Sequence, residues 1–188
     1  MKKILAYIII SFLPFSQVFA VDTEQLTQKS RAAVKALGGE LKSIFQASMK
    51  KSGPIDSISV CNTIAPQISN KISEAKGLSV ARTSLKYRNQ ENKPDEWEKS
   101  VLEQFEQRKA KGEAVKTLDF SEVTEHDGKK VFRYMKAIPT AEVCLKCHGS
   151  NIAQPIVSKI NSLYTDDKAT GFKMGDIRGA FTVIQPID

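Results

Sequence analysis

The stretch Cys144–Gly149 reads CLKCHG. On a helical turn, residues at positions i, i+3 and i+4 lie on one face, so this spacing brings the thiols of Cys144 and Cys147 and the imidazole of His148 together. Gly149 allows the turn to end directly afterwards. In an exported protein, this pattern is typical of a covalent attachment site for haem c. We therefore expect one haem c, with Cys144 and Cys147 as thioethers and His148 as the proximal iron ligand.

Two other uses of a C-x-x-C pair fit this sequence less well. A redox-active disulfide motif normally begins a helix after a strand in a βαβ unit, whereas the sheet expected here is antiparallel. A structural zinc site normally needs two ligand pairs at short spacing. Only one such pair is present, because Cys61 and His126 lie far from the motif in the sequence. Covalent haem is the favoured interpretation.

The segments around the motif predict an α+β domain. Apolar residues recur every three or four positions in stretches that predict helices over 23–51, 58–68 and 94–112. Gly53-Pro54 should end the first helix, and Pro66 should break or kink the second near Ala65. Alternating residues predict strands over 78–83, 115–123, 129–138 and 176–184, and we expect a loop between the motif and the last strand. The order predicts an antiparallel sheet flanked by N-terminal helices.

Residues 1–20 are predicted to be a secretory signal peptide. Two lysines precede an apolar run from Ile4 to Phe15, and a small-residue cleavage site ends at Ala20. The run is shorter than the roughly 20 apolar residues that a membrane-spanning helix needs. Removing 20 of the 188 residues leaves 168, which suits one domain over 21–188. We expect that domain in the periplasm or outside the cell, without a membrane span in the mature chain.

The charge of the chain argues against one class of partner. The formal charge is +7, or +5 without the two lysines of the signal peptide. Basic residues are interleaved with acids, as in 96–99 (EWEK), and no basic block stands alone. Nucleic-acid binding needs a basic patch with aromatic residues, so we expect no nucleic-acid partner. The charges are interpreted as a solvated surface.

Cys61 is the third cysteine, and its spacing leaves two interpretations open. It lies on the apolar face of the predicted helix 58–68, where it suits either a small buried side chain or an axial thiolate opposite His148. Four other side chains are candidates for the sixth iron ligand, namely His126, Met49, Met135 and Met174. Methionine would raise the reduction potential and thiolate would lower it, so the choice changes the chemistry.

Several separated motifs, taken together, resemble the c-type haem family of proteins with a PAS-like fold. They are Ser59-Val60-Cys61 followed by Ala65-Pro66, Arg82–Asn89 with Pro94 and Trp97, Cys144–Gly149, and Gly175–Ala180. Such domains occur as free exported proteins and as sensor domains of kinases and chemoreceptors. The resemblance implies a helix-flanked PAS-like antiparallel sheet with one haem c and His148 and Cys61 as axial ligands. Gln90 departs from the pattern, which has proline at that place.

The resemblance implies a free-standing, exported, redox- or gas-responsive haem protein that acts on a redox partner or signalling protein. A thiolate ligand stabilises ferric iron, and on reduction Cys61 would take up a proton and leave, which opens a place for NO or CO. The alternative is a periplasmic electron-transfer cytochrome.

We do not expect an enzyme, because peroxidase-like work needs a distal acid–base group and the only histidine outside the motif is His126. Candidates to pair with the haem propionates, or else to lie on the solvated surface, are Arg82, Lys86, Arg88 and Arg133.

Overall fold

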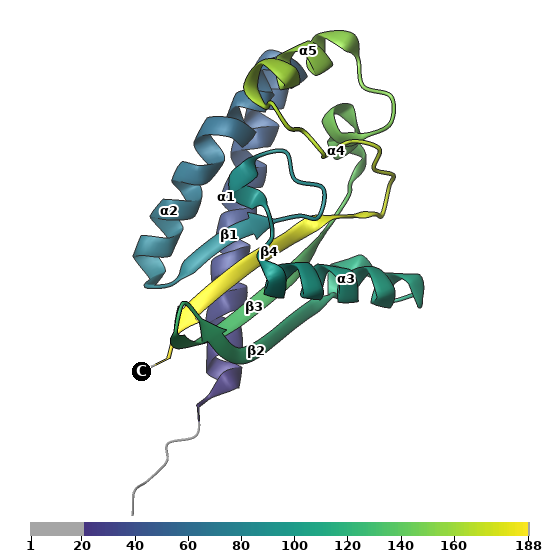
Figure 1. Cartoon of the computed structure of the whole chain (residues 1–188). Helices are drawn as coiled ribbons and strands as arrows, with labels where there is room; N and C mark the ends of the chain where they lie inside the picture. Colours follow the sequence, from purple (N-terminus) through teal and green to yellow (C-terminus); the bar gives the residue numbers. More distant parts are fainter. Residues whose placement is uncertain (1–20, 188) are drawn as a thin grey trace, which may run out of the picture.

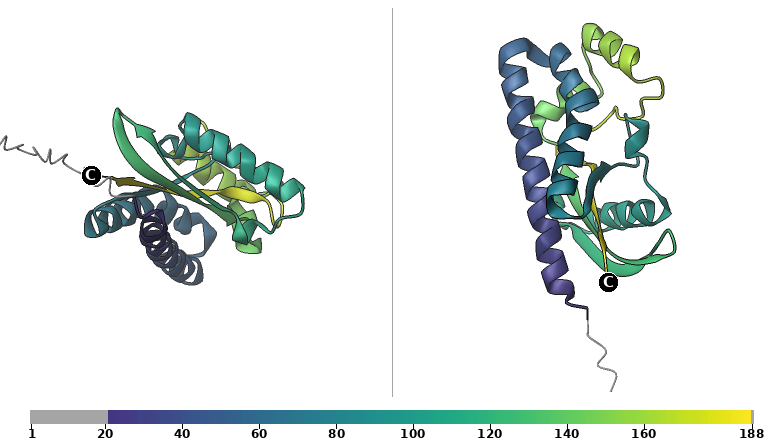
Figure 2. Two further views of the ribbon diagram at one scale, coloured as in Figure 1. Left: turned by 90° about the horizontal axis from the view of Figure 1, so that it is seen from below. Right: turned by 90° about the vertical axis from the view of Figure 1, so that its left-hand side faces the viewer.

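The computed structural model describes residues 21–187, so the signal peptide expected over 1–20 lies outside the described residues. The described part is an α+β domain built on an antiparallel sheet of order β1-β4-β3-β2. Helices α1 and α2 cover one face of this sheet and α3 covers the other (Figures 1 and 2). The predicted α+β class and the antiparallel sheet flanked by N-terminal helices are therefore confirmed. The elements are α1 Thr23–Ser59, α2 Ala65–Lys76, β1 Ser79–Thr83, α3 Glu96–Ala110, β2 Asp119–His126, β3 Lys129–Pro139, α4 Glu142–His148, α5 Gln154–Leu163 and β4 Ile177–Pro186.

The long helix α1 is interrupted where the sequence places glycine before proline. Gly53 has a φ of 74° and a ψ of −173°, so it leaves the helical region, and Pro54 then starts a second helical run. This run continues through a π-helical turn, Val60–Ile64, into α2. Pro66 explains the turn, because it has no backbone N–H to give to the preceding turn. The N–H of Ala65 bonds instead to the carbonyl of Val60, five residues earlier.

Alternation along the strands divides the core between the two faces of the sheet. Phe132 and Tyr134 of β3 pack with Val183 of β4 on the α1 and α2 side, whereas Met135 and Ala137 pack under α3. Gly38 allows α1 to lie close to the sheet, because a Cβ at that position would come within 3.0 Å of the Phe181 ring. Both faces are thus closed by ordinary apolar packing.

Two local predictions were wrong. The strand expected over 115–123 begins only at Asp119, because Val115–Thr117 forms a short 3₁₀ helix that buries Val115. The loop expected after the motif contains α5. Pro155 obscured this helix, although proline is tolerated in a first helical turn, and Ile156 and Ile160 bury one helical face.

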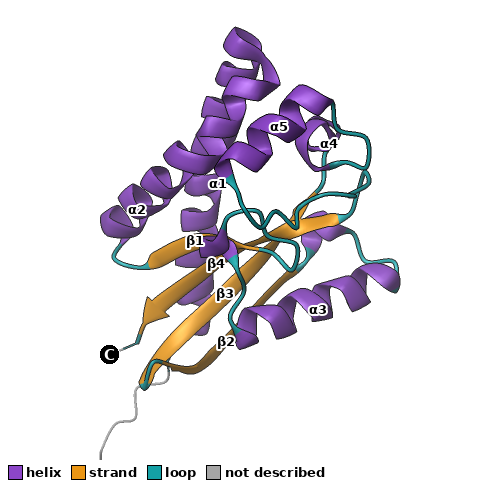
Figure 3. Ribbon diagram, turned by 45° about the horizontal axis from the view of Figure 1, so that its top comes forward, coloured by secondary structure: helices purple, strands orange, loops and turns teal. Residues whose placement is uncertain are grey.

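The residues between β3 and β4, 140–176, form what we call the α4–α5 segment. In Figure 3 this segment gathers at one end of the sheet, beside the second half of α1. The turn between β2 and β3 lies at the opposite end (Figures 1 and 3). Within residues 21–187, no helix has both the length and the apolar character needed to cross a membrane.

Candidate functional site

The CLKCHG motif lies on the short helix α4, which follows directly after the bulged end of β3. The three side chains Cys144, Cys147 and His148 are all partly buried. Gly149 ends the helix, as predicted, with an extended backbone. A Cβ at Gly149 would lie 2.7 Å from the carbonyl oxygen of Leu145, a distance that real Cβ atoms essentially never adopt. The close return of the chain therefore requires glycine at this position.

The imidazole of His148 is held by the loop that follows α5. Its Nδ1 lies 2.7 Å from the carbonyl oxygen of Ala169, and since a carbonyl only accepts, Nδ1 carries the proton. Nε2 then has a free lone pair. The ring meets Phe172 edge-on, with centroids 6.2 Å apart and an interplanar angle of 87°. Burial, followed by the positive charges of Arg178 and Arg88, lowers the pKa of His148 well below its ordinary value. His148 is thus neutral and oriented, which is the form that binds metals.

A buried ion pair fixes the backbone around this imidazole. Arg88 donates from Nε and Nη2 to the two carboxylate oxygens of Asp167, each at 3.0 Å. Nη2 also donates to the carbonyl of Cys147 at 2.7 Å and to that of Ala169 at 3.3 Å. Asp167 in turn accepts from the N–H of Ala169 at 2.8 Å. The sequence suggested Arg88 as a propionate partner, but the structure engages it with Asp167.

Cys61 lies in the π-helical turn and shares an electrostatic environment with α4. Burial raises the pKa of the Cys147 thiol, Arg88 opposes this rise, and the charge of Cys61 adds to it. Cys147 also packs against the apolar cluster that contains Ile58, one turn before Cys61. The structure therefore brings the two distant cysteines into one neighbourhood. π-Helical turns inside helices occur frequently at functional sites.

Two arginines beside these cysteines have no acidic partner in the part of the chain that the structure describes. Arg82 of β1 and Arg178 of β4 are partly buried, and neither forms an ion pair with a described carboxylate. Burial, together with the charges of Arg88 and Arg82, lowers the pKa of Arg178 to about 10. Nη1 of Arg178 donates to the hydroxyl of Ser84 at 3.2 Å. Such uncompensated cations favour an anion at this place.

Arg178 was not singled out from the sequence as a site residue, although it lies inside the motif Gly175–Ala180. A strand arginine resembles a surface residue until the fold shows what surrounds it. Of the other candidates, Lys86 lies 4.6 Å from the centroid of the Phe172 ring and donates to the carbonyl of Thr170. It therefore lines the same neighbourhood.

Arg133 is neither at this site nor on the surface, so both expectations for it were wrong. Its side chain is 2% exposed and lies under α3, 2.7 Å from Asp95 and 3.3 Å from Glu98. The guanidinium also stacks over Trp97 at 4.2 Å from the ring centroid. The alternation of β3 puts Arg133 on the same face as Met135, away from α1 and α2.

The other sulfur and imidazole candidates for an iron ligand differ from one another in burial and in their position in the fold. His126 stands at the β2–β3 turn, 3.6 Å from the Asp127 carboxylate, and the eleven residues of β3 separate that turn from the α4–α5 segment. Met135 is fully buried under α3, and Met174 is 63% exposed. Met49 lies half-buried on α1. Of all the candidates, Cys61 is the one whose charge acts on Cys147 of α4.

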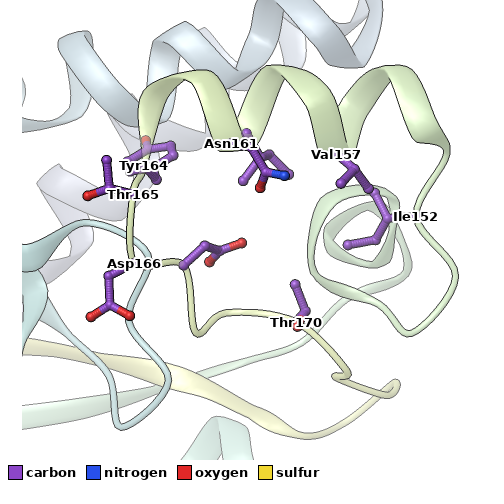
Figure 4. A pocket seen from close by; sticks show the side chains of 9 residues that line it. Ile152, Val157, Asn161, Tyr164, Thr165, Asp166 and Thr170 are labelled. Carbon is purple, nitrogen blue, oxygen red and sulfur yellow. The ribbon is translucent and has the colours of Figure 1, made fainter.

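A cavity of about 450 Å³ opens beside α4, between α5 and the loop that follows it (Figure 4). Its walls are Ile152, Val157, Ile160, Asn161, Tyr164, Thr165, Asp166, Asp167 and Thr170. None of the four predicted haem-binding residues lines it. Ile160 and Tyr164 connect the cavity to the surroundings of Cys147, because both belong to the apolar cluster against which Cys147 packs. The cavity is adjacent to the motif rather than centred on it.

No three described His, Cys, Asp or Glu side chains lie close enough to hold a metal ion between them. This arrangement differs from the zinc alternative, which needs four converging ligands. A haem iron makes a different demand, because the porphyrin supplies four nitrogens and the protein needs one ligand on each face. His148 and Cys61 lie on separate elements, namely α4 and the π-helical turn.

The fold and motif define an α+β protein whose C-x-x-C-H helix lies at one end of a four-stranded antiparallel sheet. The family model described as Tll0287-like matches residues 18–186, and the chain belongs to this family. Among solved structures, the crystal structure of the cyanobacterial heme-protein Tll0287 is similar, with a TM-score of 0.65. The two chains are 24% identical, and the likeness covers 89% of this chain and 98% of that one. At this identity the likeness concerns the fold. None of the curated proteins matches significantly.

Proposed function

We propose that this protein binds one haem c through thioethers to Cys144 and Cys147, with His148 and Cys61 as its axial iron ligands. The observation that carries the proposal is the state of His148. The imidazole is neutral, and its Nδ1–H donates a hydrogen bond to the carbonyl of Ala169, which leaves Nε2 free. His148 also lies on the same short helix as the two thiols. The heme-protein Tll0287, which shares the fold, gives further support.

The donor set fits such a group in each of its parts. The thiols occur at the i and i+3 positions of α4, and the apolar side chains Ile58, Ile160 and Tyr164 offer a non-polar wall beside them. Arg82 and Arg178, which have no described acidic partner, are suited to the two propionates. When bound, haem supplies a one-electron iron couple. The chain orients the imidazole, provides the thiolate and keeps water from the apolar wall.

The π-helical turn supports a responsive function. A thiolate that leaves the iron needs a proton and room to move, and an irregular helical turn gives less backbone resistance than regular α-helix. We infer that this protein is exported to the periplasm, carries a PAS-like domain, and reports its oxidation state or the binding of NO or CO to a redox or signalling partner. We assign it no enzymatic role.

Low-temperature EPR of the ferric holoprotein tests this proposal. A pyridine haemochrome spectrum of the same sample reports whether both thioethers form, and Cys144→Ala and Cys147→Ala should each remove one of them. The wild type should show a low-spin ferric signal with thiolate character, which Cys61→Ala abolishes. Thr63→Ala is the matched control, because Thr63 is exposed in the same π-helical turn. A wild-type spectrum without thiolate character and unchanged by Cys61→Ala would remove Cys61 from the iron.

A periplasmic electron carrier is the second candidate function. It is favoured by two exposed apolar side chains near the attachment helix, Val143 at 39% and Met174 at 63%. Backbone bonding between Gly175 and Thr140 brings the Met174 loop to the start of α4. Such exposed apolar groups beside a redox centre suit transient partners. Fast electron self-exchange with both axial ligands retained supports the carrier, whereas slow exchange coupled to loss of the thiolate supports the responsive protein.

A further inference from the structure

One carbonyl oxygen serves two donors beside the candidate iron ligand. The oxygen of Ala169 accepts from Nδ1 of His148 at 2.7 Å and from Nη2 of Arg88 at 3.3 Å. The second donor carries a full positive charge. An acceptor shared with a cation has less electron density to offer to the imidazole N–H. Arg88 therefore acts on His148 through a third group rather than by contact.

The charge of Arg88 is balanced at short range. Asp167 accepts two hydrogen bonds from Arg88, each at 3.0 Å, and the two side chains are only 8% and 11% exposed. Asp167 also accepts from the N–H of Ala169, the same residue whose carbonyl holds His148. Little water reaches these groups, so their charges are weakly screened. The pair is thus both the support of the Ala169 peptide and a source of two opposing charges near the imidazole.

We propose that Arg88 and Asp167 are positioning residues that set, in opposite directions, how strongly His148 donates electrons to the iron. This inference rests on the proposed ligation of haem iron by His148. A strong acceptor at Nδ1–H gives the imidazole more anionic character, which stabilises ferric iron and lowers the reduction potential. Arg88 weakens the acceptor and adds positive charge, so it raises the potential. Asp167 offsets that charge, so it lowers the potential.

The redox step itself is simple. With haem bound through His148, one electron from a small-molecule mediator would reduce ferric iron to ferrous iron. His148 keeps its Nδ1 proton and its bond to Ala169, and no bond among Arg88, Asp167 and Ala169 is made or broken. The two side chains act only through the charge and hydrogen bonding already present.

Spectroelectrochemical titration of the holoprotein tests this assignment with two variants. Arg88→Met should move the midpoint potential to lower values and Asp167→Asn should move it to higher values. The NMR shift of the His148 Nδ1 proton should move in opposite directions in the same two variants. Arg88→Lys, which keeps the charge, should recover part of the wild-type potential. A role in folding alone would not produce shifts of opposite sign.

Arg108→Met and Glu113→Gln are the matched controls. They remove the members of an ion pair of similar geometry, with nitrogen–oxygen distances of 2.6 and 2.8 Å, between α3 and the residues after it. Both should leave the potential unchanged. If Arg88→Met does not fold, the midpoint potentials of Asp167→Asn and Arg88→Lys still test the inference. Haem bound through His148 with no shift, or with shifts of one sign, overturns this inference, whereas a wild type that holds no haem overturns the proposed function instead.

Discussion

The two faces of the sheet surround buried arginine in different ways. Under α3, Arg133 is enclosed by the carboxylates of Asp95 and Glu98 and by the ring of Trp97. At the α4 end, the positive charge of Arg82 acts on Arg178, and neither arginine has a carboxylate partner among residues 21–187. In the first arrangement the positive charge is compensated within the chain, although Nε and Nη2 of Arg133 have no hydrogen-bond partner among the described residues. The second leaves positive charge uncompensated, as expected where an anionic group binds.

This difference separates structural from functional charge. A buried ion pair gives little net stability, but removing one partner is costly because the other charge stays buried. Arginines without a partner have the opposite property, because their removal relieves desolvation and repulsion. The free energy of unfolding should therefore respond oppositely on the two faces.

The largest expected effect is on the α3 face. Arg133→Met should lower the free energy of unfolding by about 3 kcal/mol, because it leaves Glu98 buried without its cation and removes the stacking on Trp97. Urea unfolding followed by circular dichroism measures this. Arg108→Met is the control, and the loss there should stay below about 1 kcal/mol since that ion pair is partly exposed. Equal losses in the two variants would contradict the contrast between the faces.

The next effect concerns Arg82 and Arg178 at the α4 end of the sheet and has the other sign. In protein prepared without haem, the double variant Arg82→Met and Arg178→Met should unfold at the same or a higher urea concentration than wild type, because two mutually repelling buried cations are removed. In the holoprotein, the same variant should unfold at a lower concentration, since the propionates lose their partners. Arg31→Met, an exposed arginine paired with Asp119, should leave the difference between the two forms unchanged. A double variant that destabilises both forms equally argues against an anion site.

Much of this fold could be predicted from local sequence patterns, because helical and strand periodicity depend on near neighbours in the sequence. The helix break at Gly53, the turn before β3 and the strands β3 and β4 were all visible in the order of residues. Helix α5 was not, because Pro155 and the stretch rich in Asp, Thr and Gly that follows the helix resemble a loop. The apolar face of α5 can be recognised only from its packing against Ile58.

The site was predictable in its local part and not in its distant part. Cys144, Cys147 and His148 are close because they share one helical turn. The environment of Cys61 depends on the π-helical turn that Pro66 imposes, which spacing alone does not reveal. Arg133 and Arg178 are both strand arginines, and only the packing of α3 on one face and of the α4–α5 segment at one end separates their roles.

A smaller effect on the free energy of unfolding is expected at two glycines, one at the site and one in α1. Gly149→Ala should lower the free energy of unfolding by about 1–2 kcal/mol, because its Cβ would meet the carbonyl of Leu145 at 2.7 Å. Gly39→Ala should raise it by about 0.5–1 kcal/mol, because its position is helical and no atom lies within 4 Å of the new Cβ. Thermal unfolding of both variants checks the sign. Stabilisation by Gly149→Ala would show that α4 ends differently.

The smallest effect concerns an ion pair that connects the two regions. Lys109 of α3 lies 2.8 Å from Asp176 in the α4–α5 segment, and it is the main cause that lowers the pKa of this carboxyl below its ordinary value, followed by the N–H of Lys173. A lowered pKa in the folded state means that the pair stabilises the fold above the unfolded pKa of about 3.9 and that this gain is lost as the pH falls through the lower folded value. Asp176→Asn should therefore flatten the decline of unfolding free energy as the pH falls below about 4. Asp127→Asn, at the exposed β2–β3 turn, is the control, and an equal flattening there would show that the pair does not hold α3 to the α4–α5 segment.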